Sequence, residues 1–213
     1  MKTYLLTRPE HDDTTYVLSS WCKSSIDFAK SHGFNVVDIS KEKVTKKEVE
    51  GRLKKSNPNL VVFIGHGNES SIAGDKRAPI IVVGENEKLL KNKIIYSISC
   101  KSAKILGQKS IDSGAISYAG YVDDFIFVYT KNKLSRILSD NVAELFLEPS
   151  KNYIESLLKG NTIEDAAIKY RQNLHTNFLK SLGEGYEDEP RFLWWDLKNF
   201  VVHGNKKVSL NDI

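Results

Sequence analysis

The chain has 213 residues, of which 40% are hydrophobic and 10% aromatic, and these values are typical of a globular domain with a sizeable core. The formal net charge is +4, but Lys and Arg are spread among acidic residues, so the sequence does not indicate a nucleic-acid partner. The two cysteines are too few for a disulfide scaffold. No apolar run approaches the ~20 residues of a membrane span, and the N-terminal apolar stretch is too short for a signal peptide. We therefore expect a cytoplasmic protein with no membrane partner.

The first third of the chain alternates between predicted strands and helices. Helices are expected from Asp13 or Thr14 to His32-Gly33, and from Thr45, which forms a capping box with Glu48, to near Lys55. Short apolar runs predict strands at Tyr4–Leu6, Phe34–Ile39 and Leu60–Gly65. The order β-α-β-α-β predicts right-handed crossovers and a parallel sheet.

The middle of the chain is less regular. We expect two small strands at 71–74 and 80–83, followed by a short helix at 86–90. A buried strand at 94–98, a helix at 101–113 and a further strand at 115–119 come next. The last third is mainly helical, with helices at 134–147, 153–158 and 162–178, a core aromatic cluster at 192–195 and a late edge strand at 201–204. Because the chain has no internal repeat or linker, we expect residues 1–213 to form one domain.

Two predicted strands end in residues that carry chemistry. The run Leu60 to Gly67, LVVFIGHG, places His66 between two glycines, and Cys100 follows the strand Ile94–Ile98. The carboxyl ends of parallel strands share one edge of a sheet, which is where open α/β sheets bind ligands. A Cys and a His at one edge can act as an activated nucleophile with an acid/base partner. If Cys100 also opens a helix, the dipole of that helix favours its thiolate.

Other motifs fit less well. Cys100 has Leu106 rather than Arg six residues later, which argues against a phosphatase loop, and the histidines are too scattered in the sequence for a zinc site. An amidotransferase-like hydrolase also places a Cys between a strand and a helix, but it needs flanking glycines and a later His, for which only His203 remains. This hydrolase and a structural, unreactive Cys100 remain alternatives.

These residues resemble the caspase-like cysteine peptidases of clan CD, a group that includes caspases, gingipains, clostripain, separase and the CHAT proteases. The segments that carry the resemblance are the strand ending in His66-Gly67, SCKSAKILGQKSIDSGAISYAGYVDD from Ser99, and the late FLWWDLKNFVVHGN. The resemblance is to the prokaryotic gingipain/CHAT-like branch. It implies a mostly parallel α/β sheet with helices on both faces, as a three-layer, flavodoxin-like sandwich.

The resemblance also implies a mechanism and a substrate. Cys100 would attack the scissile carbonyl of a protein or peptide, His66 would act as acid and base, and the N–H groups of Gly67 and Cys100 would form the oxyanion hole. No third catalytic residue, metal or organic cofactor is implied, although some relatives respond to calcium. A caspase-like pseudoenzyme or interaction module remains an alternative.

Four acidic residues flank this predicted site and bear on its specificity. Asp12 and Asp13 lie in the first loop, and Asp123 and Asp124 follow the strand that ends at Ala119. A carboxylate in the substrate pocket favours Arg or Lys before the cleaved bond, as in gingipain-like relatives. The competing interpretations are that Asp13 only caps a helix and that Asp123-Asp124 is a solvated turn. If Arg8 instead lined the substrate pocket, it would favour an acidic residue before the cleaved bond.

Overall fold

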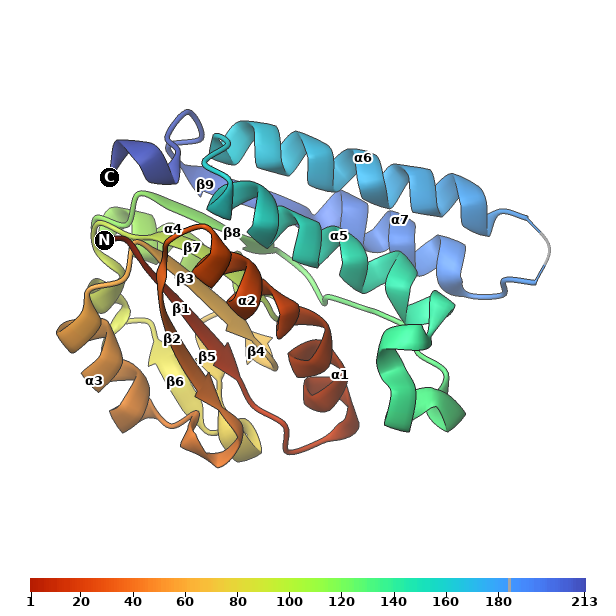
Figure 1. The fold of residues 1–213 in the computed structure, drawn as a ribbon, viewed down its shortest axis with the longest axis horizontal. Coiled ribbons are helices and arrows are strands. Elements are labelled where there is room, and N and C mark those ends of the chain that lie inside the picture. Colours follow the sequence, from red (N-terminus) through yellow and green to blue (C-terminus); the bar gives the residue numbers. More distant parts are fainter. Residues whose placement is uncertain (184) are drawn as a thin grey trace.

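A six-stranded sheet forms the centre of the computed structural model, which describes residues 1–183 and 185–213 (Figure 1). Its strand order is β2-β1-β3-β7-β8-β9, and every neighbouring pair is parallel except β8 and β9. The strands are β1 (Thr3–Arg8), β2 (Asn35–Ser40), β3 (Leu60–Ile64), β7 (Ile94–Ile98), β8 (Ser117–Tyr121) and β9 (Phe200–Gly204). The predicted parallel sheet and its late edge strand are thus confirmed.

Helices cover both faces of the sheet, which makes the three-layer sandwich expected from the sequence. One face packs against α1 (Asp13–Cys22), α2 (Ser24–Ser31), α5 (Asn141–Leu158), α6 (Ile163–Ser181) and α7 (Glu189–Asn199). The other packs against α3 (Lys46–Ser56), α4 (Leu106–Asp112) and a small sheet of β4 (Gly67–Asn68), β5 (Ser71–Ala73) and β6 (Pro79–Val82).

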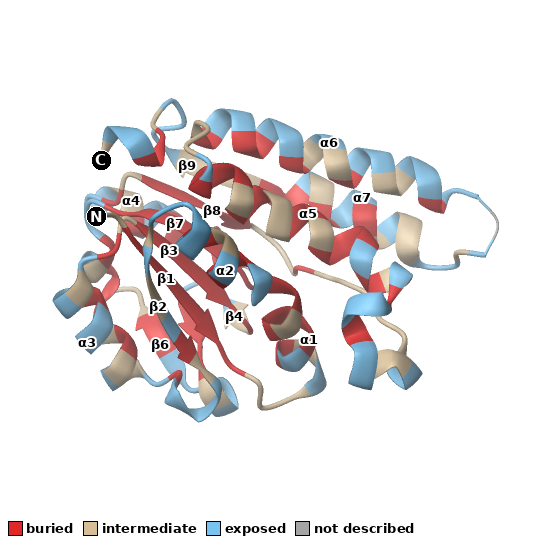
Figure 2. Ribbon diagram, in the orientation of Figure 1, coloured by how far each residue is buried: buried red, intermediate tan, exposed pale blue. Residues whose placement is uncertain are grey.

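The alternation of side chains along each strand separates the two cores. In β1, Tyr4 and Leu6 pack with the first group of helices, whereas Leu5 packs with the second. Figure 2 shows that the central strands are buried almost throughout, as both covered faces require. None of the helices in the described part of the chain is long and apolar enough to cross a membrane.

The structure differs from the predicted helices in several places, of which two lie away from the site. The helix expected from 14 to 32 is broken at Lys23 into α1 and α2. In place of the two helices expected at 134–147 and 153–158, the structure has the 3₁₀ segment η4 (Lys131–Ser139) and then one continuous helix, α5, capped by Asp140. Pro149 does not break α5, because the Leu145 carbonyl that loses its helical donor accepts a 2.7 Å hydrogen bond from the Asn177 side chain. Further 3₁₀ turns are η1 (Lys41–Lys43), η2 (Asp75–Arg77), η3 (Glu87–Leu90) and η5 (Leu210–Asp212).

The aromatic cluster at 192–195 was expected in the core, and this expectation is wrong for the tryptophans. These residues lie in α7, where Leu193 is buried but Trp194 and Trp195 are 51% and 36% exposed. Consecutive helical residues point in directions about 100° apart, so only part of such a run can face the sheet.

Arg8 lies in the carboxyl end of β1 and belongs to the framework of the fold. Its buried guanidinium donates to both carboxylate oxygens of Asp38 at the end of β2, at 2.8 and 2.6 Å, and to Ser19 of α1 at 2.8 Å. Glu10 lies 3.4 Å away. Arg8 therefore ties together β1, β2 and α1, and it is not free to bind an acidic substrate residue.

We expect Arg8→Met to lower the free energy of unfolding by about 3 kcal/mol, because it removes the cation paired with Asp38 and leaves Glu10 with the Lys41 ammonium at 3.9 Å. The matched control is Arg52→Met, which removes an exposed pair with Glu48 within α3 and should cost less than about 0.5 kcal/mol. Urea denaturation measures both values. Equal losses in the two variants would contradict a structural role for Arg8.

Candidate active site

The loops that carry His66 and Cys100 lie side by side at the carboxyl edge of the sheet. Strands β3 and β7 are adjacent and parallel, and Ile64 is paired with Ile98 at their carboxyl ends. Just beyond this pair, the Gly65 N–H donates to the Ile98 carbonyl at 3.2 Å. The structure therefore brings together the two loops that the sequence predicted would share one edge.

Gly67 shows how closely these two loops pack. A Cβ atom at this position would lie 2.9 Å from the Ser99 hydroxyl oxygen and 3.0 Å from the Cys100 carbonyl oxygen. Cβ atoms do not approach other heavy atoms this closely, so only glycine fits without displacing residues 99 and 100. The residue after His66 thus contacts the residue before Cys100 and the Cys100 backbone.

The His66 side chain is held by Asp12 from the loop after β1. Its Nε2 lies 2.7 Å from Asp12 Oδ2, while Asp12 Oδ1 accepts hydrogen bonds from the N–H and hydroxyl of Thr15 at the start of α1. Burial acts to raise the pKa of Asp12, but the hydrogen bonds from Thr15 and His66 outweigh it and hold the pKa well below its usual range. Asp12 is therefore an ionised helix cap that also orients a histidine.

This contact fixes which nitrogen of His66 is available for chemistry. A carboxylate can only accept, so Nε2 must carry the proton in the Asp12–His66 hydrogen bond. In the neutral ring the lone pair then resides on Nδ1, for which no hydrogen-bond partner is found among the described residues. The sequence did not indicate this third residue as an orienting group, and Asp12 was expected in a substrate pocket instead.

Cys100 is not at the start of a helix, contrary to the sequence prediction. Lys101 has a left-handed backbone with φ 58°, and the N–H groups of Lys101 and Ala103 donate to the carbonyls of Asp123 and Tyr121. These bonds to the end of β8 replace the first turn of a helix, which starts only at Leu106. The dipole of α4 is therefore not directed at the thiol.

The surroundings of Cys100 also disfavour the thiolate form that the sequence predicted. Its Sγ lies 3.8 Å from the Phe125 carbonyl oxygen, and the residue is partly buried. Burial raises the pKa of the Cys100 thiol to about 11, and the charge of the nearby Asp124 carboxylate acts in the same direction. In this state Cys100 is a protonated thiol at neutral pH.

The acidic residues expected to bind substrate lie in different surroundings. Asp13 is exposed in the first turn of α1, and Asp12 is bonded to His66. Asp123 and Asp124 both face Lys101, whose Nζ lies 3.7 and 3.3 Å from their carboxylates. Asp124 also lies beside the Cys100 thiol, so the 123–124 pair adjoins the candidate nucleophile.

A segment that sequence reasoning missed covers one side of this site. Residues 124–130 have no regular structure, and they are held by Asp196, which accepts from the Ile126 N–H at 3.0 Å, and by the Trp195 indole, which donates to the Asp124 carbonyl at 2.9 Å. Asp196 is fully buried, and burial raises its pKa well above the usual value. The sequence feature that could have indicated this contact is the aspartate within the apolar run FLWWDL.

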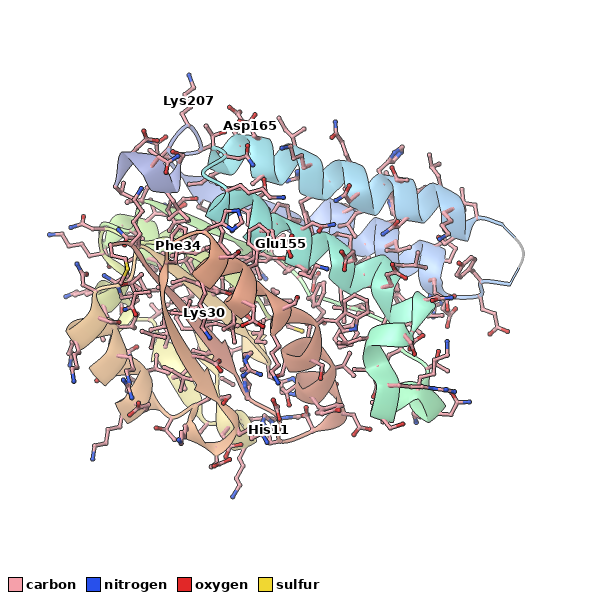
Figure 3. All side chains as sticks on the ribbon, in the orientation of Figure 1. His11, Lys30, Phe34, Glu155, Asp165 and Lys207 are labelled. Carbon is pink, nitrogen blue, oxygen red and sulfur yellow. The ribbon has the colours of Figure 1, made fainter. Side chains whose placement is uncertain are left out.

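Although the histidines are scattered in the sequence, the fold brings two of them close to one carboxylate. His11, Asp12 and His66 each offer one ligand atom, and these atoms lie within 4.8 Å of one another. Figure 3 labels His11 in the loop that follows β1. His203 is placed differently: its Nε2 lies 2.8 Å from the Ala103 carbonyl oxygen, and its strand position pairs with Tyr118 rather than with the carboxyl end of β8.

Comparisons with known proteins bear on the fold. No family model matches the sequence, and no curated protein matches it. Among solved structures, the Arg-specific cysteine proteinase gingipain R has a TM-score of 0.63 at 11% identity, over 97% of this chain and 47% of that chain. The complex of the RgpB pro- and mature domains from Porphyromonas gingivalis has a TM-score of 0.63 at 10% identity, over 98% and 48%. Caspase-1 from Spodoptera frugiperda has a TM-score of 0.52 at 13% identity, over 95% and 86%.

These similarities confirm the expected fold, because gingipain R and caspase-1 are caspase-like clan CD cysteine peptidases. At such identities the similarity establishes the arrangement of strands and helices and not the chemistry. This chain spans about half the length of the gingipain structures that it matches.

The protonated state of Cys100 has a measurable consequence. Alkylation by iodoacetamide requires the thiolate, so its rate at Cys100 in the unliganded protein should rise about tenfold per pH unit from about pH 7 to 10, without a plateau. Cys22 is 2% exposed with its pKa raised to about 12, so it serves as the internal control and should react more slowly throughout. Peptide mass spectrometry measures both rates; a plateau near the ordinary thiol pKa of about 8.5 would contradict the raised pKa.

Proposed function

We propose that this chain is a cysteine endopeptidase in which Cys100 is the nucleophile and His66 the acid/base. The observation that carries the proposal is the packing of the His66-Gly67 loop against Ser99-Cys100 at the ends of two adjacent parallel strands, with His66 oriented by Asp12. A nucleophile, a base and a group that orients the base are the parts that covalent acyl transfer needs. The caspase-like fold shared with gingipain R and caspase-1 supports the same assignment.

The reaction begins with loss of the thiol proton. As the substrate enters, Nδ1 of His66 takes the proton from Cys100, and the resulting thiolate attacks the scissile carbonyl carbon. The tetrahedral intermediate collapses to a thioester as His66 returns the proton to the departing amine. Water, deprotonated by His66, then attacks the thioester, and the carboxylic acid product leaves while the proton returns to Cys100. Asp12 stabilises the imidazolium that forms twice in this cycle.

Negative charge develops on the substrate carbonyl oxygen in both halves of the reaction. We assign its stabilisation to the backbone N–H groups of Gly67 and Cys100. In support, the Cys100 N–H makes no hydrogen bond within the described residues, so it is available as a donor. Such donors contribute about 3 kcal/mol each to the transition state.

For specificity, we infer a basic residue before the cleaved bond. Asp123 and Asp124 adjoin Cys100 and already hold one cation, the Lys101 ammonium, which a substrate guanidinium would displace. Gingipain R, with the same fold, is described as Arg-specific. Of the four predicted substrate-binding residues, Asp12 takes a different role through His66, and Asp13 remains a candidate from the first loop.

An inactive caspase-like scaffold is the second candidate. The observation that favours it is the partly buried, protonated Cys100, whose pKa of about 11 makes it a poor nucleophile in the unliganded state.

Substitution of Cys100 separates the two candidates. We expect Cys100→Ala to abolish peptide cleavage, because the acyl group has no other acceptor, while the circular dichroism spectrum is unchanged. Cys22→Ala removes the other thiol, which is buried in the core, and should keep activity. A fluorogenic peptide assay measures kcat/KM, and equal activity of Cys100→Ala and the parent chain would contradict the peptidase proposal.

Specificity is tested with two peptides that differ only in Arg or Asp before the cleaved bond. Once the bound substrate covers these carboxylates, loss of the charge-assisted partner costs about 3 kcal/mol, so kcat/KM should favour Arg by at least roughly 100-fold. Asp124→Asn, Asp123→Asn and Asp13→Asn are compared with the control Asp27→Asn, an exposed carboxylate on α2.

At least one of the three test substitutions should remove the Arg preference, and the control should not. A parent chain that prefers Asp or a neutral residue would overturn the pocket assignment and leave the Cys100–His66 mechanism standing.

A further inference from the structure

We propose that His11, Asp12 and His66 form a binding site for one Zn²⁺ ion, and that the ion switches off the peptidase by occupying His66. The metal site stands on the geometry alone, whereas its effect on cleavage rests on the proposed function. The three ligand atoms lie within 4.8 Å of one another, and the side chains are only partly covered.

One donor distance is close to that of a tetrahedral zinc site, and a second must change by a fraction of an ångström. Zn–N and Zn–O bonds of about 2.0–2.2 Å place neighbouring ligand atoms about 3.3 Å apart. The Nε2 of His11 lies 3.5 Å from Asp12 Oδ2, close to that value. The Nε2 of His66 is 2.7 Å from the same oxygen, so the pair must open by about 0.6 Å as the metal replaces the proton between them.

His11 provides an independent observation that points to a ligand. Both of its ring nitrogens are buried, and neither has a hydrogen-bond partner in the described part of the chain. Buried polar atoms normally have partners, so an unpaired imidazole requires an explanation. Its Nδ1 lies 3.9 Å from the Asp75 carboxylate, an arrangement in which a small movement gives the carboxylate–histidine–metal geometry common at zinc sites.

The ligand set selects the class of metal. Two imidazoles and one carboxylate suit Zn²⁺ and leave a fourth coordination position for water. Water can reach this position because the Asp12 and His66 side chains are partly exposed. Ca²⁺ and Mg²⁺ require six or more oxygen ligands, which this cluster lacks.

One neighbouring group opposes metal binding. The guanidinium of Arg77 lies 3.6 Å from Asp12 Oδ2, and its side chain is 69% exposed. Its charge repels a cation at Asp12, but its exposure allows it to swing into solvent. Arg77 therefore lowers the affinity for the metal without blocking the site.

Metal binding removes the base that the proposed mechanism needs. A neutral imidazole that binds a metal through Nε2 carries its remaining proton on Nδ1. His66 then has no lone pair with which to accept the Cys100 proton, so formation of the thiolate stops.

The direct test is calorimetric titration with Zn²⁺, without substrate, of the parent chain, Cys100→Ser, His11→Gln, Arg77→Met and His32→Gln. We expect one ion per chain and unchanged affinity in Cys100→Ser and in His32→Gln, the exposed control at the end of α2. His11→Gln removes a metal ligand and should weaken Zn²⁺ binding at least roughly 100-fold. Loss of a residue that only hydrogen-bonds a ligand already lowers metal affinity 10- to 100-fold, and loss of the ligand itself should cost more. Arg77→Met should bind more tightly.

Unchanged affinity in His11→Gln would overturn the site, and loss of binding in Cys100→Ser would show that the thiol is a ligand instead. Zn²⁺ titration of the parent chain followed by NMR of the histidine rings needs no variant: His11 and His66 should shift among the five histidines, and shifts confined to others would overturn the site.

The switch is tested by the ratio of peptidase activity with and without Zn²⁺ within each variant. The inhibiting concentration should rise in His11→Gln in parallel with the dissociation constant; inhibition that does not follow binding would overturn the switch. His11-dependent binding in a chain that cleaves no peptide would support the metal site and contradict only the proposed peptidase.

Discussion

The parallel pairing of β3 with β7 is the constraint on which the site depends. It ends both strands at the same level, so that His66 and Cys100 leave the sheet within two residues of the paired Ile64 and Ile98. The contact of Gly67 with Ser99 and Cys100 then prevents the two loops from sliding past each other. A shift by one residue in either strand would separate the base from the nucleophile and also exchange the two cores, because alternate side chains face opposite layers.

Asp12 connects this edge to the rest of the fold. Arg8 fixes the end of β1 to β2 and α1, Thr15 binds one oxygen of Asp12, and the other oxygen faces His66, His11 and Arg77. Because these groups compete for one carboxylate oxygen, the protonation and orientation of His66 are coupled to whichever cation lies beside Asp12. The low pKa of Asp12 means that this stabilisation is present above its unfolded pKa of about 3.9 and is lost only as the pH falls below that value.

The parts of the fold that local patterns determine could be predicted from the sequence. The apolar strands at 60–64 and 94–98, their parallel order and the placement of His66 and Cys100 at one edge follow from short-range periodicity and connection rules. The surroundings of these residues could not be predicted, because they come from distant segments: Asp12 for His66, Phe125 and Asp124 for Cys100, and Asp196 for the segment over the site. The left-handed Lys101, which delays the helix, depends likewise on carbonyls at the end of β8.

The proposed reaction passes through a covalent acyl-enzyme between Cys100 and a peptide substrate. The most direct measurement is the mass of the intact chain after brief incubation with a peptide ester ending in Arg and quenching in acid, followed by peptide mapping. We predict a mass increase of one peptidyl group located on Cys100. Consumption of the ester with the label on another residue, or with no labelled chain at any time, would contradict the assignment of Cys100 as the nucleophile.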